Sequence, residues 1–94
     1  MVKRLTISRV AYTHIDKIIE FNNLRNQSDN YSRKFVKSLF KEFNLLTKFP
    51  HIGINTNKDD TYLLVWNDYY IYYTISESVI EIQAIRHQKE DILH

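Results

Sequence analysis

Cysteine is absent from this chain of 94 residues, and glycine, proline, tryptophan and methionine occur once each. Without thiols the protein can form no disulfide, no thiolate metal site and no cysteine nucleophile. The sequence also contains no glycine-rich phosphate loop and no serine-centred nucleophile motif. These absences exclude several large classes of enzyme and cofactor-binding protein, and we expect no cofactor.

Long hydrophobic runs are also absent. No stretch approaches the roughly 18 apolar residues that cross a bilayer. The N-terminal segment MVKRLTISRV has three cations but neither the apolar core nor the cleavage site of a signal peptide. We therefore expect a cytoplasmic protein without membrane contact.

Net charge of one sign is small, because 13 Lys and Arg residues stand against 11 Asp and Glu residues. A net charge of +2 does not by itself indicate binding to nucleic acid. A hydrophobic content of 44% is that of a folded globular protein. At this length the chain can enclose one core, so residues 1–94 are expected to form a single domain.

The first half of the sequence predicts one strand and two helices. Residues 2–7 alternate between apolar and basic side chains and predict a short strand. Ser8 is placed to cap a helix that runs to about residue 24. After a polar connector at residues 25–30, apolar residues three and four apart predict a second helix over residues 31–48. Pro50 and Gly53 follow, and we expect a loop from there to Asp60.

After Asp60 the apolar period changes to two. Residues 62–66, 69–75 and 79–86 predict three strands, separated by turns at residues 67–68 and 76–78. The order strand, helix, helix, strand, strand, strand predicts an α+β fold. In it, the N-terminal strand and a helical hairpin pack on one face of a small, mainly antiparallel four-stranded sheet.

The strand parity predicts an open sheet face, because two helices can cover only one side. Alternation assigns Ile80, Ile82 and Ala84 to the helix side, matching Ile71, Tyr73 and Ile75 of the preceding strand. The face without helices then carries a second set, namely Tyr70, Tyr72 and Ile85, with Trp66 at its margin and His87 on the same side. Exposed tyrosine and tryptophan are typical of protein interfaces. A loop or the C-terminal segment covering this face is the alternative.

Nucleic-acid bases can also stack on exposed aromatic residues. Phosphates, however, require nearby cations, and no Lys or Arg occurs from Asp59 to Ile85. The sequence therefore favours a polypeptide as the partner of this face.

Four motifs in this order resemble the ParE/RelE toxins of bacterial type II toxin-antitoxin modules, also called plasmid stabilisation proteins. They are ISRVAYTHIDKII at the first strand and helix, LTKFPHIG at the exit of the second helix, YYIYYTI in a strand, and IQAIRHQKEDI at the C-terminus. The last one is similar to the I-x-x-I-x-H-x-x-x-D-I close of the ParE branch. The resemblance covers nearly the whole chain.

The resemblance implies a small α+β toxin held inactive by a cognate antitoxin protein. ParE-like members are associated with poisoning DNA gyrase, and contact with DNA is expected only through the antitoxin. RelE-like members instead cleave messenger RNA on the ribosome with a set of cationic and acid-base side chains. Tyr70 stands where RelE-like toxins carry arginine, so the sequence favours a non-enzymatic inhibitor. Many ParE-like sequences carry an arginine near Tyr62 or Leu63, and its absence here leaves a different target open.

The C-terminal residues Arg86, His87 and Asp91 are further candidates for binding the target or the antitoxin. In a ribonuclease, Arg86 and His87 would be catalytic, with Lys58 and Lys89 as outlying cations. The alternative is structural: His87 can fix the C-terminal turn with Asp91, and Arg86 can pair with Glu90 or Asp91. The four histidines have no zinc-site spacing, so we expect no metal. An inert family member kept as an interaction partner is a third possibility.

Overall fold

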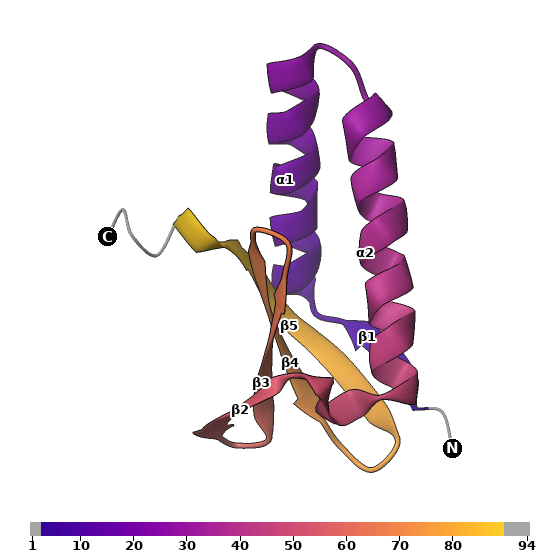
Figure 1. Cartoon of the computed structure of the whole chain (residues 1–94), viewed down its shortest axis with the longest axis vertical. Coiled ribbons are helices and arrows are strands. Elements are labelled where there is room, and N and C mark those ends of the chain that lie inside the picture. The colour runs from indigo at the N-terminus through magenta and orange to yellow at the C-terminus, as the bar shows by residue number, and fades with distance from the viewer. Residues whose placement is uncertain (1–2, 90–94) are drawn as a thin grey trace.

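The structure is a computed structural model, and it describes residues 3–89. Two long helices form a hairpin that rises beside and above a twisted sheet (Figure 1). The elements in chain order are β1 (Arg4–Ile7), α1 (Arg9–Asn26), α2 (Asn30–Lys48), the 3-10 helix η1 (Pro50–Ile52), β2 (Ile54–Lys58), β3 (Thr61–Trp66), β4 (Tyr69–Ile75) and β5 (Val79–His87). The predicted helices and the last three strands are confirmed with ends shifted by one or two residues.

The sheet has the strand order β1-β5-β4-β3-β2, with β1 parallel to β5 and the other pairs antiparallel. The α+β class and the mainly antiparallel sheet are confirmed. The expected number of four strands is wrong, because residues 54–58 form a fifth strand where we expected a loop. This strand lies at the sheet edge and is mostly exposed and polar, so it shows no alternation of apolar residues. Its backbone pairing with β3 defines it.

The helical hairpin is fixed at both ends by serine hydroxyls. The Ser8 hydroxyl accepts a hydrogen bond from the Ala11 amide at 3.0 Å and donates to the Gln83 carbonyl at 3.0 Å. Ser8 is therefore the predicted N-cap of α1, and it also joins α1 to β5. At the far end, the Ser32 hydroxyl of α2 donates to the Asn23 side chain of α1 at 2.7 Å, so this hydrogen bond joins the two helices close to their connector.

The core lies between the helices and one face of the sheet. Its buried hydrophobic residues come from α1, α2, β4 and β5, and form one cluster: Ala11, Ile15, Phe35, Leu39, Phe43, Leu46, Ile71, Tyr73, Ile80, Ile82 and Ile85. Full burial of one such aliphatic side chain contributes about 1.5–3 kcal/mol to the free energy of unfolding. This face of the sheet is therefore closed by the molecule itself.

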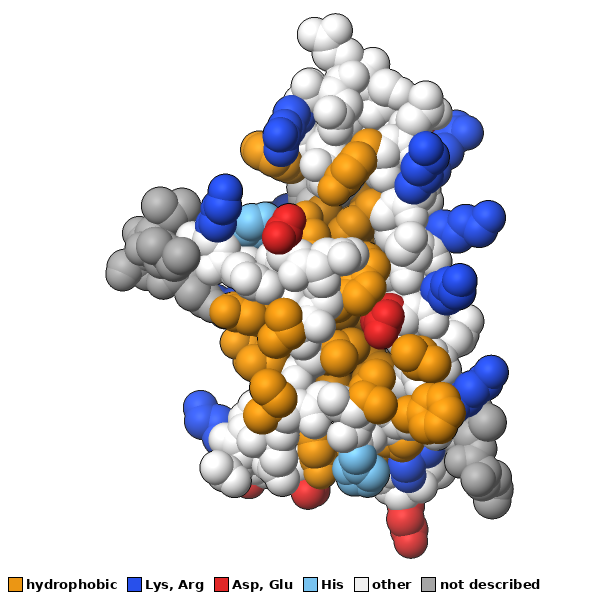
Figure 2. Space-filling view, in the orientation of Figure 1, with side chains coloured by type: hydrophobic (Ala, Val, Ile, Leu, Met, Phe, Trp, Pro, Cys, Tyr) orange, Lys and Arg blue, Asp and Glu red, His pale blue; other side chains and the backbone are white. Residues whose placement is uncertain are grey.

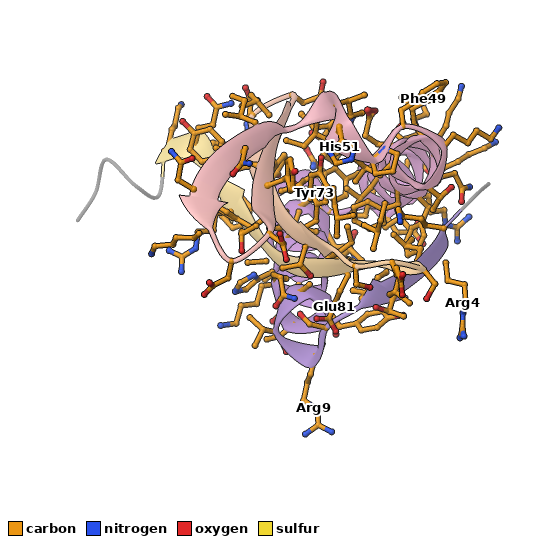
Figure 3. All side chains as sticks on the ribbon, turned by 90° about the horizontal axis from the view of Figure 1, so that it is seen from below. Arg4, Arg9, Phe49, His51, Tyr73 and Glu81 are labelled. Carbon is orange, nitrogen blue, oxygen red and sulfur yellow. The ribbon has the colours of Figure 1, made fainter. Side chains whose placement is uncertain are left out.

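Tyr73 connects the sheet to the segment that follows α2. Its hydroxyl donates to the Pro50 carbonyl at 2.8 Å and accepts from the Gly53 amide at 3.0 Å. In Figure 3, Tyr73 lies in the upper half of the view with His51 and Phe49, whereas Arg9 and Glu81 lie in the lower half. A Cβ added at Gly53 would lie 2.5 Å from the Tyr73 hydroxyl, so this close approach requires glycine. The single proline and the single glycine are thus both tied to one tyrosine.

A β-bulge at Gln83 changes the parity of β5. Tyr73 pairs with Ile82, but the preceding Tyr72 pairs with Ala84, so Gln83 is the extra residue. From Ala84 onward the even-numbered residues face away from the core. Ile85 and His87 consequently lie on the same side as Ile71 and Tyr69, with which they pair.

Candidate functional site

The face of the sheet opposite the core carries apolar side chains from four strands. In the register, Tyr72 pairs with Leu63 and Ala84, and Tyr70 pairs with Val65. These residues alternate with the buried Ile71 and Tyr73, so they point away from the core. We call this set the outer face, and it consists of Ile54, Leu63, Val65, Tyr70, Tyr72 and Ala84.

The outer face remains accessible in the part of the chain that the structure describes. Val65 is 51% exposed, Ile54 is still more exposed, and Tyr70 and Tyr72 are half-buried. Figure 2 shows hydrophobic side chains gathered at the left of the view, over the β2–β3 part of the sheet. The predicted alternative, a covering segment, is not found among residues 3–89 over Val65 and Ile54.

Charged and polar residues lie at the margins of the outer face. Arg86 pairs with Tyr70 at one end, and Glu81 pairs with Thr74 at the other. The side-chain amide of Gln83, in the bulge, donates hydrogen bonds to the Thr74 hydroxyl and to the Glu81 carboxylate. These polar side chains therefore form one hydrogen-bonded group at this end of the outer face. The outer face is therefore an apolar centre with a polar rim, which is the usual arrangement of a protein interface.

Tyr70 and Tyr72 lie where the strand parity placed them, but four other placements are wrong. Ile85 is 2% exposed and belongs to the core, His87 lies on the same side of the sheet as Ile85, and Ala84, expected on the helix side, lies on the outer face. The bulge at Gln83 causes these three errors, because strict alternation cannot anticipate an inserted residue. Trp66 packs against Phe35 of α2, with ring centroids 5.6 Å apart, because it shares the parity of the core-side Tyr62 and Leu64.

A second surface feature is a groove between α1, the β3–β4 turn and the end of β5. Its volume is about 830 Å³. We call it the α1 groove, and its lining residues are His14, Lys17, Ile18, Phe21, Asn22, Arg25, Tyr31, Asp68, Tyr69, Ile85, Arg86, His87 and Lys89. Figure 2 shows blue and pale-blue side chains together at the upper left, beside the helical hairpin. The structure thus brings Arg86, His87 and Lys89 together, whereas Lys58 lies on the β2 edge.

The α1 groove carries an excess of positive charge. Its cations are Lys17, Arg25, Arg86 and Lys89, and Asp68 is its carboxylate. Within residues 3–89 the ion pair is Arg33–Asp29 on α2, at 2.9 Å, so none of the four groove cations has a carboxylate partner there. Four cations that share one carboxylate repel each other, and a bound anion would relieve that repulsion.

The two histidines of the groove are oriented by backbone amides. The His87 Nδ1 accepts from the Lys89 amide at 3.1 Å, and the His14 Nδ1 accepts from the Ile85 amide at 3.2 Å. In the neutral rings the proton therefore resides on Nε2. The His87 ring also packs edge-on against Tyr69 at 5.1 Å. The expected interaction partner of His87, Asp91, lies outside the described residues, as does Glu90.

The phenol of Tyr73 titrates abnormally but belongs to neither surface. Burial raises its pKa above the ordinary value of 10.0. The hydrogen bond from the Gly53 amide partly opposes this increase, and the nearby Tyr62 phenol adds to it. Tyr73 is therefore a structural residue, and its pKa matters for stability at alkaline pH.

Sequence reasoning missed residues of both surfaces, although signals for them existed. Leu63 and Val65 share the parity that assigned Tyr70 and Tyr72 to the outer face, because β3 pairs with β4 throughout its length. On α1 the groove residues His14, Lys17, Ile18, Phe21 and Arg25 recur at spacings of three and four, which is one stripe of a helix. The stripe gives no clear periodic signal in the sequence, because it mixes charged, aromatic and aliphatic side chains.

A comparison with known protein families identifies the chain. Residues 5–92 match the family described as "ParE toxin of type II toxin-antitoxin system, parDE". The chain belongs to the ParE toxin family. Membership of a parDE toxin family implies a cognate antitoxin, so the toxin role and its partner are established at this level.

A solved structure supports the same fold for this ParE-family chain. It is described as "Chromosomal ParDE TA system from P. aeruginosa" and superposes with a TM-score of 0.74. The sequences are 14% identical, and the match covers 92% of this chain and 96% of that chain. No curated protein matches the sequence. Within residues 3–89, neither helix of this ParE-family chain is long and apolar enough to cross a membrane.

Proposed function

We propose that this ParE-family toxin inhibits growth by binding a protein target in the cytoplasm, with DNA gyrase as the target that family resemblance indicates. We further propose that the antitoxin covers the outer face. The single observation that carries both parts is the apolar centre of that face, built from the paired rows of β3 and β4.

The chemistry of the outer face suits a polypeptide partner. Tyr70 and Tyr72 offer large apolar area with a hydroxyl at the tip, and they lose little side-chain entropy on binding. Leu63 and Val65 extend the same surface without adding charge. Interfaces between proteins are depleted of charge at their centres, whereas a phosphate backbone requires cations there.

An antitoxin that covers the outer face would also solve a solubility problem. Apolar patches of this kind promote aggregation when they stay uncovered. In addition, the outward edge of β2 borders this face and offers unpaired backbone groups to an extended segment. A partner lying across β2 and the tyrosines would therefore contact both features at once.

The test begins with induced expression in bacteria. We expect growth arrest, and we expect relief when a short neighbouring reading frame with a DNA-binding N-terminal half and a charged amphipathic tail is expressed with the toxin. Purified toxin should then inhibit supercoiling by gyrase, and the antitoxin should reverse the inhibition. Growth arrest without any effect on gyrase would indicate another target, and no growth arrest would indicate an inert family member.

A ribosome-dependent messenger RNA endonuclease is the second candidate function. The observation that favours it is the α1 groove, which brings Arg86 and Lys89 together with the backbone-oriented imidazoles of His14 and His87. Cationic side chains stabilise the phosphorane of a phosphodiester cleavage, and histidine can transfer the proton.

This second candidate has a direct test with a matched control. Purified toxin is incubated with translating ribosomes, and messenger RNA is examined for cleavage. Cleavage that is lost in His87→Ala but retained in His51→Ala, an exposed histidine on η1 outside the groove, would establish the nuclease and overturn the non-enzymatic proposal. Intact messenger RNA with inhibited gyrase would support the leading proposal.

A further inference from the structure

We propose that the α1 groove binds the phosphodiester backbone of a single-stranded nucleic acid, DNA or RNA. This goes beyond the proposed function, in which the target and the antitoxin are proteins that use the outer face. The binding requires no cleavage and no antitoxin. It is carried by the arrangement of charge and aromatic rings in the groove.

The first observation is the spatial order of the cations. Lys17 and Arg25 lie on the same stripe of α1, with an axial rise between them of about 12 Å. Within a duplex each strand carries one phosphate per about 3.4 Å of helix axis, and an unpaired strand is more extended, so Lys17 and Arg25 are far enough apart to contact different phosphates of one strand. Arg86 and Lys89 come from the other wall of the groove and can contact the same backbone from the opposite side.

The second observation is that the groove cations are not engaged in ion pairs within the part of the chain that the structure describes. Among residues 3–89 none of the four lies within ion-pair distance of a carboxylate, and all four are exposed. The guanidinium groups of Arg25 and Arg86 carry donors in the fork geometry that matches phosphate oxygens. Counterions now held near these groups would be released when a strand binds, which is the main source of affinity for nucleic acid.

The third observation concerns the aromatic residues. Phe21 is 63% exposed, and Tyr31 is also exposed, and both line the groove beside the cations. Unpaired bases stack on such rings at about 1–3 kcal/mol per base, whereas bases within a duplex are inaccessible. This combination favours a single strand over a duplex.

The carboxylate of Asp68 helps to choose between a nucleic acid and an acidic peptide. It lies in the groove and repels a phosphate and a peptide carboxylate alike, so its charge does not discriminate between them. A nucleotide, however, also carries exocyclic amines and hydroxyls that can donate hydrogen bonds to this carboxylate, and acidic side chains carry no such donors. The mixed lining of cations, aromatic rings and a carboxylate therefore matches a nucleotide chain better than a run of acidic side chains.

The test measures binding of purified full-length toxin to fluorescently labelled oligonucleotides by anisotropy, over 50–200 mM salt. We expect a dissociation constant near 10⁻⁴–10⁻⁶ M and a slope of log K against log salt of about −2.8, if each groove cation contacts one phosphate. That slope corresponds to about a fifty-fold loss of affinity over this salt range. Single-stranded DNA and RNA are measured separately, together with a duplex and a poly-glutamate peptide.

Charge-matched variants identify the surface. In the double variant Lys17→Gln, Arg25→Gln we expect the slope to fall to about −1.4 and the affinity at 50 mM salt to fall at least ten-fold. The control Lys34→Gln, Lys41→Gln removes the same charge from exposed positions of α2 outside the groove, and should change affinity less than two-fold. Circular dichroism confirms that both variants are folded.

Three results would overturn the proposal. The first is an equal loss of oligonucleotide affinity in the two double variants. The second is an affinity of the toxin for poly-glutamate or for the duplex as high as its affinity for the single strand. The third is no binding of the toxin to single-stranded oligonucleotide at 50 mM salt. None of these measurements depends on growth arrest, on gyrase or on the antitoxin. A failure of the proposed function and a failure of this inference are therefore distinguishable.

Discussion

The outer face and the α1 groove share strands β4 and β5 but differ in their chemistry. On the outer face, apolar side chains of β3 and β4 occupy the centre and charges lie at the rim. In the groove, cations from α1 and β5 surround aromatic rings. Beyond the bulge, Ala84 of β5 faces outward, whereas Ile85 and His87 lie on the other side of the sheet and line the groove. Arg86 pairs with Tyr70 at the margin of the outer face and also lines the groove.

This difference shows that one inserted residue can decide the chemistry of two surfaces. If Gln83 were paired in regular alternation instead of forming a bulge, Ile85 and His87 would face outward and the core would lose a buried isoleucine. With it, His87 joins the groove and the outer face keeps a small residue, Ala84, opposite Tyr72. The bulge therefore separates a surface suited to protein from a surface suited to an anion.

The largest expected effect tests this assignment through stability. Ile85→Ala removes a buried side chain and should lower the free energy of unfolding by about 2–5 kcal/mol. Val65→Ala on the exposed outer face should change it by less than about 0.5 kcal/mol. Urea denaturation of both variants measures the difference. Similar losses in the two variants would contradict the parity that the bulge sets.

The second prediction concerns binding at the outer face. Val65→Glu places a charge among apolar residues and should weaken antitoxin binding by about 2–4 kcal/mol, a factor of roughly 30–1,000. Val10→Glu on α1 is the control, because Val10 is 56% exposed, close to the 51% of Val65. Calorimetric titration with the antitoxin gives the affinities. If both variants bind like the unmodified toxin, the antitoxin uses another surface.

The third prediction concerns Tyr73, which joins η1 to the sheet and belongs to neither the outer face nor the α1 groove. Tyr73→Phe removes the donor to Pro50 and leaves the Gly53 amide without its acceptor, so stability should fall by about 1–3 kcal/mol at pH 7. Antitoxin affinity and oligonucleotide affinity should stay unchanged. A change in either would mean that η1 contributes to that surface.

The raised pKa of Tyr73 adds a pH dependence to this comparison. Below pH 10 the phenol is neutral in both states, and its contribution to stability is complete. As the pH rises above 10, the unfolded phenol ionises first, so the folded toxin loses stability until the raised pKa is passed. Denaturation of toxin and Tyr73→Phe at pH 7–11 should show their stability difference shrinking at the alkaline end.

Much of this architecture could be predicted from residue patterns, because local chemistry specifies it. Ser8 ends a strand and caps a helix through its own hydroxyl, and the α2 stripe buries Phe35, Leu39 and Phe43 on one side. Strand β2 could not be predicted in this way. Its polar residues at an exposed edge are held by backbone pairing, which leaves no periodic signal in the side chains.

The candidate site was predictable in part for a related reason. Alternation located Tyr70 and Tyr72, and the C-terminal motif singled out Arg86 and His87. The α1 groove was not predictable, because only tertiary packing places Lys17 and Arg25 in the same groove as Arg86. The parity change in β5 depends on the pairing of a whole strand with its neighbour, and no single residue in the sequence marks it.

The smallest expected effect tests what holds the bulge in place. Ser8→Ala removes the cap of α1 and the donor to the Gln83 carbonyl, and should cost about 0.5–2 kcal/mol of stability. Thr13→Ala is the control, since its hydroxyl bonds to Arg9 within α1 and touches neither β5 nor the bulge. Because the Gln83 carbonyl loses a partner in the first variant, amide hydrogen exchange in β5 around Gln83 should quicken there and not in the second. Unchanged exchange in Ser8→Ala, with the same loss of stability, would mean that Ser8 acts only as a helix cap and that the pairing of β4 with β5 maintains the bulge alone.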